Sequence, residues 1–143
     1  MVKLKMKKRG VSPVIATVLL IALVTAAAAI VFLVVIPMLQ PSAEAILTYD
    51  QGSTDVGSGN RQMLITIKAT GGPLTLGSVD ISPVLTISVV NGTDVDMIGQ
   101  TIVAESQVTV KVIGAFSIGT EYTITFNFSS GDDSISKAAT IIA

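Results

Sequence analysis

Residues 11–39 of the chain are VSPVIATVLLIALVTAAAAIVFLVVIPML, and this stretch decides the fold. Eighteen of its 29 residues are large aliphatic residues, Met or Phe, and none is charged. A bilayer hydrocarbon core of about 30 Å is crossed by roughly 20 helical residues, so the stretch is long enough to span a membrane. It is apolar on every side, and such a helix has to be buried all round, in lipid or among other helices.

Local chemistry predicts where this helix begins and ends. Ser12 followed by Pro13 suits an N-cap and the first helical position, because the N–H that proline lacks would have no helical partner there. Pro37 interrupts the hydrogen-bond ladder near the other end, and Pro41 follows before the first acidic residue. We therefore expect a helix at about residues 13–38.

Charge is distributed unevenly around the apolar stretch. The chain of 143 residues has a formal net charge of −1, but five of its nine basic residues lie in the first nine positions, where there is no acid. An excess of Lys and Arg is typical of the cytoplasmic flank of a membrane helix. The basic residues of this flank are Lys3, Lys5, Lys7, Lys8 and Arg9.

Composition excludes several classes of chemistry. The chain has no Cys and no His, so it lacks a thiolate nucleophile, the usual general base near pH 7 and a zinc site of imidazole or sulfur ligands. Four acids lack the spacing of a calcium loop and are interpreted as solvated turn residues. Four basic residues beyond position 10 are too few for nucleic-acid binding by the head. We expect no enzyme activity, no metal and no cofactor. These acids are Asp94, Asp96, Asp132 and Asp133, and the basic residues are Arg61, Lys68, Lys111 and Lys137.

Beyond residue 40 the sequence changes to short stretches of Thr, Ser, Val and Ile separated by Gly, Asn and Asp. Apolar and polar side chains alternate most clearly in residues 121–128, as in a half-buried strand. Such strands and evenly spaced turns predict an α+β chain: the hydrophobic helix, a linker at 40–45, and an antiparallel all-β sandwich head, immunoglobulin-like, at 46–143. The expected strands are 45–49, 62–69, 73–76, 84–90, 101–104, 107–113, 121–128 and 135–142, with turns at 57–60, 71–73, 91–92 and 131–133.

The junction between the basic flank and the helix carries a motif. Lys7-Lys8-Arg9-Gly10, followed by Val11-Ser12-Pro13-Val14-Ile15-Ala16 and the long apolar run, resembles the class III signal peptide and mature N-terminus of archaeal type IV pilins. The resemblance covers residues 7–16 closely and extends to about residue 39 in character. Bacterial pilins carry a glutamate at the fifth mature position, whereas this chain has Ile15 there, which fits the archaeal branch.

The resemblance implies processing and assembly. A prepilin peptidase would cleave between Gly10 and Val11 on the cytoplasmic side, so that residues 1–10 are a leader peptide and residues 11–39 the mature N-terminal helix. The precursor would lie in the cytoplasmic membrane. An assembly ATPase and a membrane platform would then place the mature protein in an extracellular surface filament that serves in adhesion. The residues assigned to processing are Lys7, Lys8, Arg9, Gly10 and Val11.

Energetics gives this cleavage a physical role. Each Lys or Arg at the bilayer centre costs about 2.5–3.5 kcal/mol, so the basic flank holds the helix in place. Loss of residues 1–10 leaves four basic and ten acidic residues, and the formal net charge changes from −1 to −6. Exposure of eighteen large apolar side chains to water would cost on the order of 30–50 kcal/mol, so the freed helix has to pack with copies of itself in a helical homopolymer. Small residues permit close packing of such helices. The positions expected in the filament core are Val14, Val18, Ile21, Ala26, Ala27, Ala28, Ala29, Phe32 and Val35.

Three other interpretations are open. An archaellar (flagellar) filament subunit follows the same processing logic. A membrane-anchored β-sandwich binding protein requires only the helix and the head, but it leaves the junction at Gly10 unexplained. A cleaved secretory signal is suggested by the small residues in Ala43-Glu44-Ala45, yet the apolar stretch is longer than the roughly 7–15 residues of a signal-peptide core.

The head contains two sequons for N-glycosylation, Asn91-Gly92-Thr93 and Asn127-Phe128-Ser129. Asn91 falls on an expected turn, and Asn127 has the outward parity of an expected strand whose inward residues are aromatic. Asn-Gly is also the preferred pair for an unmodified type I′ hairpin turn. Glycans are therefore candidate partners at either site.

Overall fold

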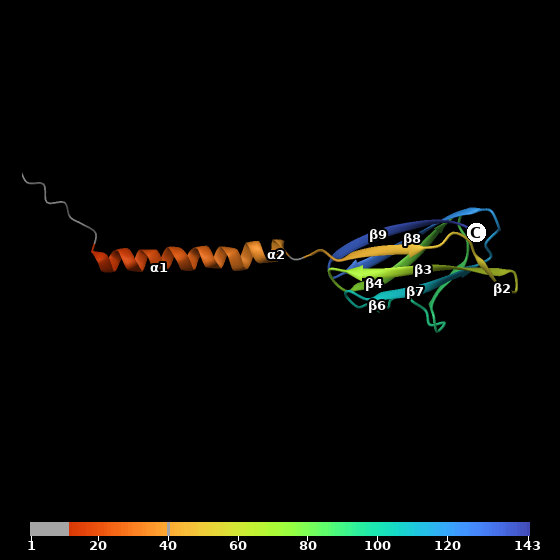
Figure 1. The fold of residues 1–143 in the computed structure, drawn as a ribbon, viewed down its shortest axis with the longest axis horizontal. Helices are drawn as coiled ribbons and strands as arrows, with labels where there is room; N and C mark the ends of the chain where they lie inside the picture. Colours follow the sequence, from red (N-terminus) through yellow and green to blue (C-terminus); the bar gives the residue numbers. More distant parts are fainter. Residues whose placement is uncertain (1–11, 40) are drawn as a thin grey trace, which may run out of the picture. The chain divides into compact units, whose positions relative to one another are not determined.

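A computed structural model describes residues 12–39 and 41–143, and the chain divides after Gln40 into two compact units (Figure 1). The first contains one continuous helix, formed by α1 (Pro13–Ile30), η1 (Val31–Val35) and α2 (Ile36–Met38). Its bounds confirm the prediction of a helix at residues 13–38. At 1.5 Å per residue its 26 residues extend about 39 Å. Pro13 is the first helical residue, and Ser12 precedes it without a side-chain hydrogen bond to the helix.

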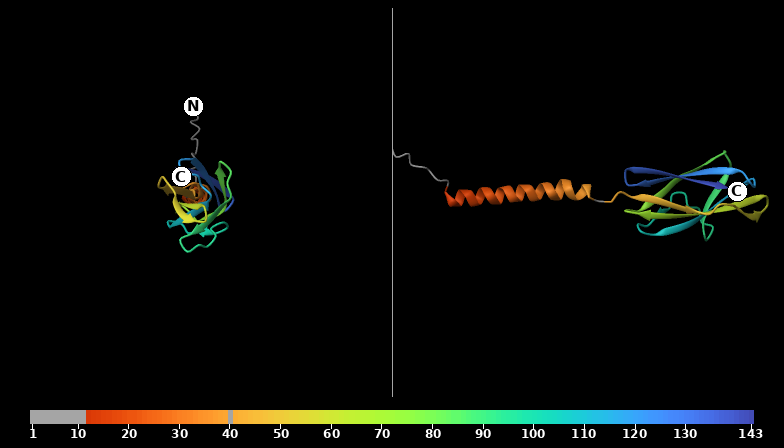
Figure 2. Two further views of the ribbon diagram at one scale, coloured as in Figure 1. Left: turned by 90° about the vertical axis from the view of Figure 1, so that its right-hand side faces the viewer. Right: turned by 45° about the horizontal axis from the view of Figure 1, so that its top comes forward.

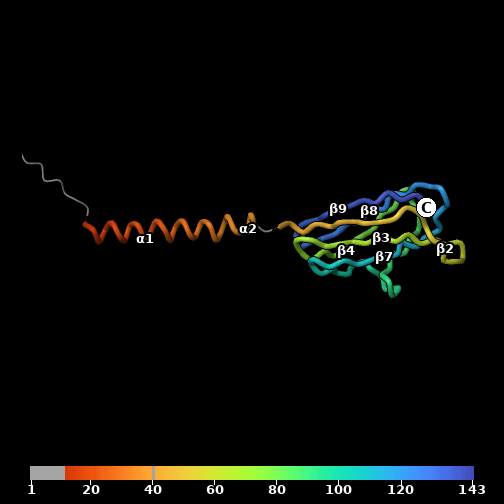
Figure 3. Tube along the Cα trace, in the orientation of Figure 1, coloured from red at the N-terminus to blue at the C-terminus, as the bar shows by residue number. Residues whose placement is uncertain are grey.

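Pro37 lies within this helix, and the helix changes from α to π geometry in the turn before it. Proline has no N–H, and its ring presses against the carbonyl four residues earlier. The five residues before Ile36 form a wider π turn, in which the Ile36 N–H donates to the Val31 carbonyl. A π turn places one additional residue in the loop of the hydrogen bond, so the ladder continues around the proline. The regular tube in Figure 3 continues through this segment.

The second unit is a two-layered, sandwich-like antiparallel β structure, visible in the right-hand view of Figure 2. One sheet has the order β1-β3-β7-β5, with β2 also paired to β3, and the other has the order β6-β4-β8-β9. The strands of the first sheet are β1 (Glu44–Tyr49), β2 (Thr54–Gly57), β3 (Asn60–Thr70), β5 (Ile87–Asn91) and β7 (Gln107–Gly114). Those of the second are β4 (Leu74–Ser82), β6 (Thr101–Ile102), β8 (Glu121–Ser130) and β9 (Asp133–Ile142).

Strand parity places the core between the two sheets. In β8 every second residue is buried, from Tyr122 to Phe128, as the alternating pattern predicts. The rings of Phe126 and Phe128 stack with their centroids 6.2 Å apart. Each buried apolar side chain contributes about 1.5–3 kcal/mol, so this core stabilises the head. Its largest members are Phe126, Phe128, Met63, Ile65, Ile67, Leu74, Leu76, Ile102, Ile124, Ile141, Val110 and Val112.

Several expected strand boundaries are wrong. β4 continues to Ser82 beyond its expected end at residue 76, because a bulge between Leu76 and Ser78 absorbs Gly77 and pairing with β8 resumes. The strand expected at 84–90 begins only at Ile87, and residues 84–86 form no strand. β1 begins at Glu44, inside the stretch that the sequence assigns to the linker.

The two shortest strands also differ from expectation. β2 is absent from the predicted set because all four of its residues are exposed and show no alternation of apolar and polar side chains. It forms through backbone pairing to the start of β3, next to the expected turn at 57–60. β6 has only two of its four expected residues, at the edge of its sheet.

Tyr122 connects the start of β8 to the loop before it. Its side chain is buried, and its hydroxyl oxygen accepts a hydrogen bond from the Ser117 backbone N–H at 3.1 Å. Its ring meets that of Phe116 edge to face, with the centroids 5.0 Å apart. Sequence periodicity predicts burial of the ring but contains no signal for the partner of the hydroxyl.

We expect Tyr122→Phe to lower the free energy of unfolding of the head by about 1–3 kcal/mol, because the Ser117 N–H loses its acceptor. Urea unfolding of residues 41–143, which have a core of their own, measures the change. Tyr49→Phe is the matched control, since the Tyr49 hydroxyl lies 3.5 Å from the Thr140 N–H, at the limit of a hydrogen bond. Equal losses from both variants would contradict the assigned role.

Candidate functional site

The surface of the helix is the most unusual feature of the molecule. Every described residue from Ser12 to Leu39 is exposed in the single chain, including all seventeen large apolar side chains. Their exposed fractions range from 40% at Val35 to 78% at Met38. Within the described residues, this helix is long and apolar enough to cross a membrane. Among residues 12–39, no side chain of the helix covers this surface.

The two hydroxyl groups inside the helix do not interrupt its apolar surface. Thr17 Oγ1 donates to the Val14 carbonyl at 2.8 Å, and Thr25 Oγ1 donates to the Ala22 carbonyl at 3.0 Å. Side-chain bonds to the preceding turn satisfy a hydroxyl without an external partner. Both threonines can therefore face lipid or another helix without an unsatisfied donor.

The structure places the expected filament-core positions around this helix. Ala26 to Ala29 lie near the end of α1, and each is exposed. They form a narrow section between the bulky residues of the first turns and those of η1. Such a section permits the close approach of a second backbone. The remaining core positions are also exposed, and they are Val14, Val18, Ile21, Phe32 and Val35.

The processing residues lie outside the described part of the chain. The cleavage junction predicted between Gly10 and Val11 remains a prediction from the sequence, as do the roles of Lys7, Lys8 and Arg9.

The two sequons occupy different positions in the head. Asn91 is the last residue of β5, and Asn127 lies within β8, whose neighbours in the sheet are β4 and β9. The type I′ alternative at Asn91-Gly92 is wrong, because that turn requires positive φ at both residues and only Asp94 in this loop, at 59°, has it. The side chain of Asn91 instead organises the loop through hydrogen bonds to Thr93 and Val95.

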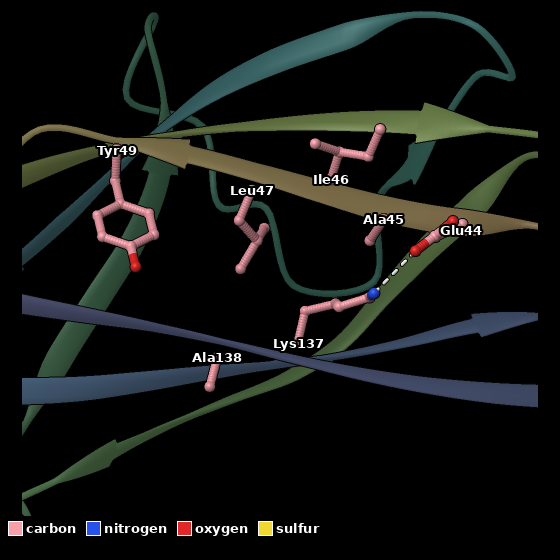
Figure 4. Close-up of a pocket in the computed structure, with 7 residues that line it drawn as sticks. All are labelled: Glu44, Ala45, Ile46, Leu47, Tyr49, Lys137 and Ala138. Atoms are coloured by element: carbon pink, nitrogen blue, oxygen red, sulfur yellow. Dashed lines mark hydrogen bonds and ion pairs between the residues drawn. The ribbon is translucent and has the colours of Figure 1, made fainter.

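An open groove of about 320 Å³ lies between the edge strands β1 and β9 (Figure 4). Leu47 and Tyr49 contribute apolar surface, and Lys137 Nζ lies 2.9 Å from a carboxylate oxygen of Glu44. Figure 4 shows this pair bridging the two strands at one end of the groove. Sequence reasoning did not find it, because the partners are 93 positions apart. The full lining is Glu44, Ala45, Ile46, Leu47, Tyr49, Lys137 and Ala138.

We expect Lys137→Met to change the free energy of unfolding of the head by less than about 1 kcal/mol. The pair is solvent-exposed, with the Glu44 side chain 59% accessible, and such pairs contribute little because water and salt screen them. Urea unfolding in low salt and in 1 M salt measures the effect. A loss of several kcal/mol in low salt that diminishes in 1 M salt would contradict this expectation and show that the bridge holds the two edge strands together.

The expected solvated acids are on the surface. Asp94 pairs with Lys111 at 2.9 Å, and Asp96 accepts a hydrogen bond from the Ile98 N–H. Asp132 lies in the turn between β8 and β9, and Asp133 begins β9; both are exposed. Among residues 12–39 and 41–143 there is no group of three or more acidic, His or Cys side chains that could hold a metal ion.

The helix is therefore the candidate functional site: an apolar surface with satisfied hydroxyls, which requires lipid or other helices around it. Neither a protein-family model nor a curated protein sequence matches this chain.

Proposed function

We propose that this chain is a structural subunit of an extracellular archaeal type IV pilus. After removal of the leader, the N-terminal helix packs with copies of itself in the filament core, and the β head forms the outer surface. The precursor resides in the cytoplasmic membrane. A prepilin peptidase, an assembly ATPase and a membrane platform are its partners in assembly, and the filament serves in adhesion.

The exposed apolar helix is the observation that carries the proposal. Its uncovered side chains would cost roughly 25–50 kcal/mol in water, relative to burial. Lipid covers this surface in the precursor, and neighbouring helices cover it in the polymer. Transfer from lipid to a helix bundle is nearly neutral in hydrophobic terms, so removal of the basic flank takes away the charge barrier that holds the helix in the membrane. The same hydrophobic cost opposes loss of a subunit, without disulfides, since the chain has no Cys.

The head is immunoglobulin-like in this proposal. Strand order supports the assignment: β1-β3-β7-β5 opposite β4-β8-β9 corresponds to the two sheets of a constant-type immunoglobulin domain, with β2 and β6 as added strands. Tyr122 supports it as well, because a tyrosine at the start of the equivalent strand bonds to backbone a few residues upstream in such domains. A β head that forms the outer surface of a filament requires no catalytic group, so we assign it a structural role.

Mass analysis of protein sheared from the surface of the producing cells tests the proposal. We expect an intact mass that lacks residues 1–10, in material of high molecular weight that depolymerises only in detergent or denaturant. N-terminal sequencing should begin at Val11. A detergent-extracted monomer that retains Met1 would support the membrane-anchored binding protein instead. A soluble fragment beginning near residue 46 would support a secretory signal.

The archaellar alternative predicts the same cleavage and the same helix packing. Motility separates the two, because loss of an archaellar subunit abolishes swimming, whereas loss of a pilin abolishes attachment to surfaces. A deletion strain that attaches normally but no longer swims would contradict the pilus assignment.

A further inference from the structure

The two sequons of the head differ in how their side-chain amides are bonded. Asn91 ends a strand at the edge of its sheet, and Asn127 lies inside a central strand. Both residues are half-buried, so exposure alone does not distinguish them. The distinction is which atom of each amide makes hydrogen bonds.

The amide oxygen of Asn91 accepts three hydrogen bonds from the loop that follows it. The Thr93 backbone N–H donates at 2.9 Å, the Thr93 hydroxyl at 2.8 Å and the Val95 backbone N–H at 3.0 Å. Three donors around one atom identify it as the oxygen, because the amide NH2 group accepts no hydrogen bond. Nδ2 is the other branch of the planar amide, and it has no acceptor within the part of the chain that the structure describes.

The loop around Asn91 leaves space for a large substituent. Residues 92–96 are all exposed, and a Cβ atom added at Gly92 would meet no atom within 4 Å. The loop between β5 and β6, green to turquoise in Figure 1, extends away from the two sheets. A group attached to Nδ2 would therefore be solvated, and the hydrogen bonds that organise the loop would remain.

Asn127 has the opposite arrangement. Its Nδ2 donates to Ser78 Oγ at 3.0 Å and to an Asp80 carboxylate oxygen at 2.9 Å, both on β4. These two bonds use both N–H groups of the amide, so a substituent on the nitrogen would remove one of them. The adjacent residues Phe126 and Phe128 are buried in the core, which holds this part of β8 in the sheet.

We propose that Asn91 accepts an N-linked glycan and that Asn127 remains unmodified. The inference rests on the proposed location outside the cytoplasmic membrane, where the donor is an oligosaccharide joined to a polyprenyl phosphate or pyrophosphate. Asn91 Nδ2 forms a bond to C1 of the first sugar as the C1–O bond to the lipid phosphate breaks. The phosphate leaves with the electron pair, and one Nδ2 proton passes to a base of the transferase.

Glycopeptide mapping of the full-length protein from its producing cells tests the assignment. We expect a glycan on the peptide that contains Asn91 and none on the peptide that contains Asn127. The intact mass should fall by the whole glycan in Asn91→Gln and should show no glycan loss in Asn127→Gln. Thr93→Ala, which leaves the asparagine in place, should also lose the glycan, whereas Thr93→Ser preserves the sequon and should retain it.

A glycan on Asn127, on both asparagines or on neither overturns the assignment. The same preparations separate it from the filament proposal. Processed filaments without a glycan at Asn91 overturn the glycan assignment alone. Unprocessed monomers in the membrane that carry the Asn91 glycan overturn the filament and leave the glycan assignment intact.

Discussion

Replacement of Ala27 by aspartate is expected to reduce filament yield below detection. Ala27 lies near the middle of the 26-residue helix, too far from either end for a short side chain to reach water. An aspartate at the centre of a membrane helix costs about 2.5–3.5 kcal/mol, and an unpaired ion among packed helices costs several. Every subunit carries the same penalty at each addition to the polymer. Electron microscopy and the yield of sheared protein measure the loss.

Two controls separate charge from other effects of this substitution. Ala27→Asn introduces a side chain of the same size without charge and should reduce assembly less severely. Thr109→Asp places the charge on the head, where Thr109 is exposed and its side-chain hydroxyl lies 3.0 Å from that of Thr66. It should leave the yield near normal. Equal losses from the Ala27 and Thr109 aspartate variants would mean that the helix is not the core of the polymer.

Gly10→Phe is expected to block leader removal and to abolish filaments. Because Gly10 has no Cβ, the peptidase can approach the peptide bond between Gly10 and Val11 closely, and a bulky side chain at position 10 would prevent that approach. The basic flank then stays attached, and passage of each of its five cations through the bilayer centre costs about 2.5–3.5 kcal/mol. Intact mass should reveal full-length protein that retains residues 1–10, confined to the membrane fraction.

Gly10→Ala is the matched variant, because it adds one methyl group and should still be processed. Normal filaments from Gly10→Phe would contradict the junction assignment. Filaments in which that variant retains residues 1–10 would also contradict the proposal that the basic flank has to be removed before assembly.

The helix could be predicted almost completely from the residues. Its apolar run and the Ser12-Pro13 start are contiguous in the chain, and the observed span, Pro13–Met38, agrees with the expected one. The response to Pro37 was not predictable, because an apolar run does not distinguish a helix that ends from one that widens into a π turn. That choice depends on backbone geometry over several residues.

The strands of the head were predictable where one face is buried. β8 and β7 agree with their alternation, because burial of one face imposes a period of two. β2 and the continuation of β4 past Gly77 were not. Backbone pairing maintains both without such a pattern: β2 pairs with β3, which follows it in the chain, and β4 pairs with the distant strand β8.

By itself the sequence determined an apolar helix, a change of composition after it and two sequons that are equivalent as motifs, because each of these features depends on neighbouring residues. Only the tertiary structure decided that Asn91 and Asn127 differ and that Glu44 meets Lys137. The contact of Asn127 with Asp80 joins residues 47 positions apart, and that of Glu44 with Lys137 joins residues 93 apart. Such contacts exist only in the folded head. Pairing of β4 with β8 brings Asp80 to Asn127, and packing of the two sheets brings Glu44 on β1 to Lys137 on β9.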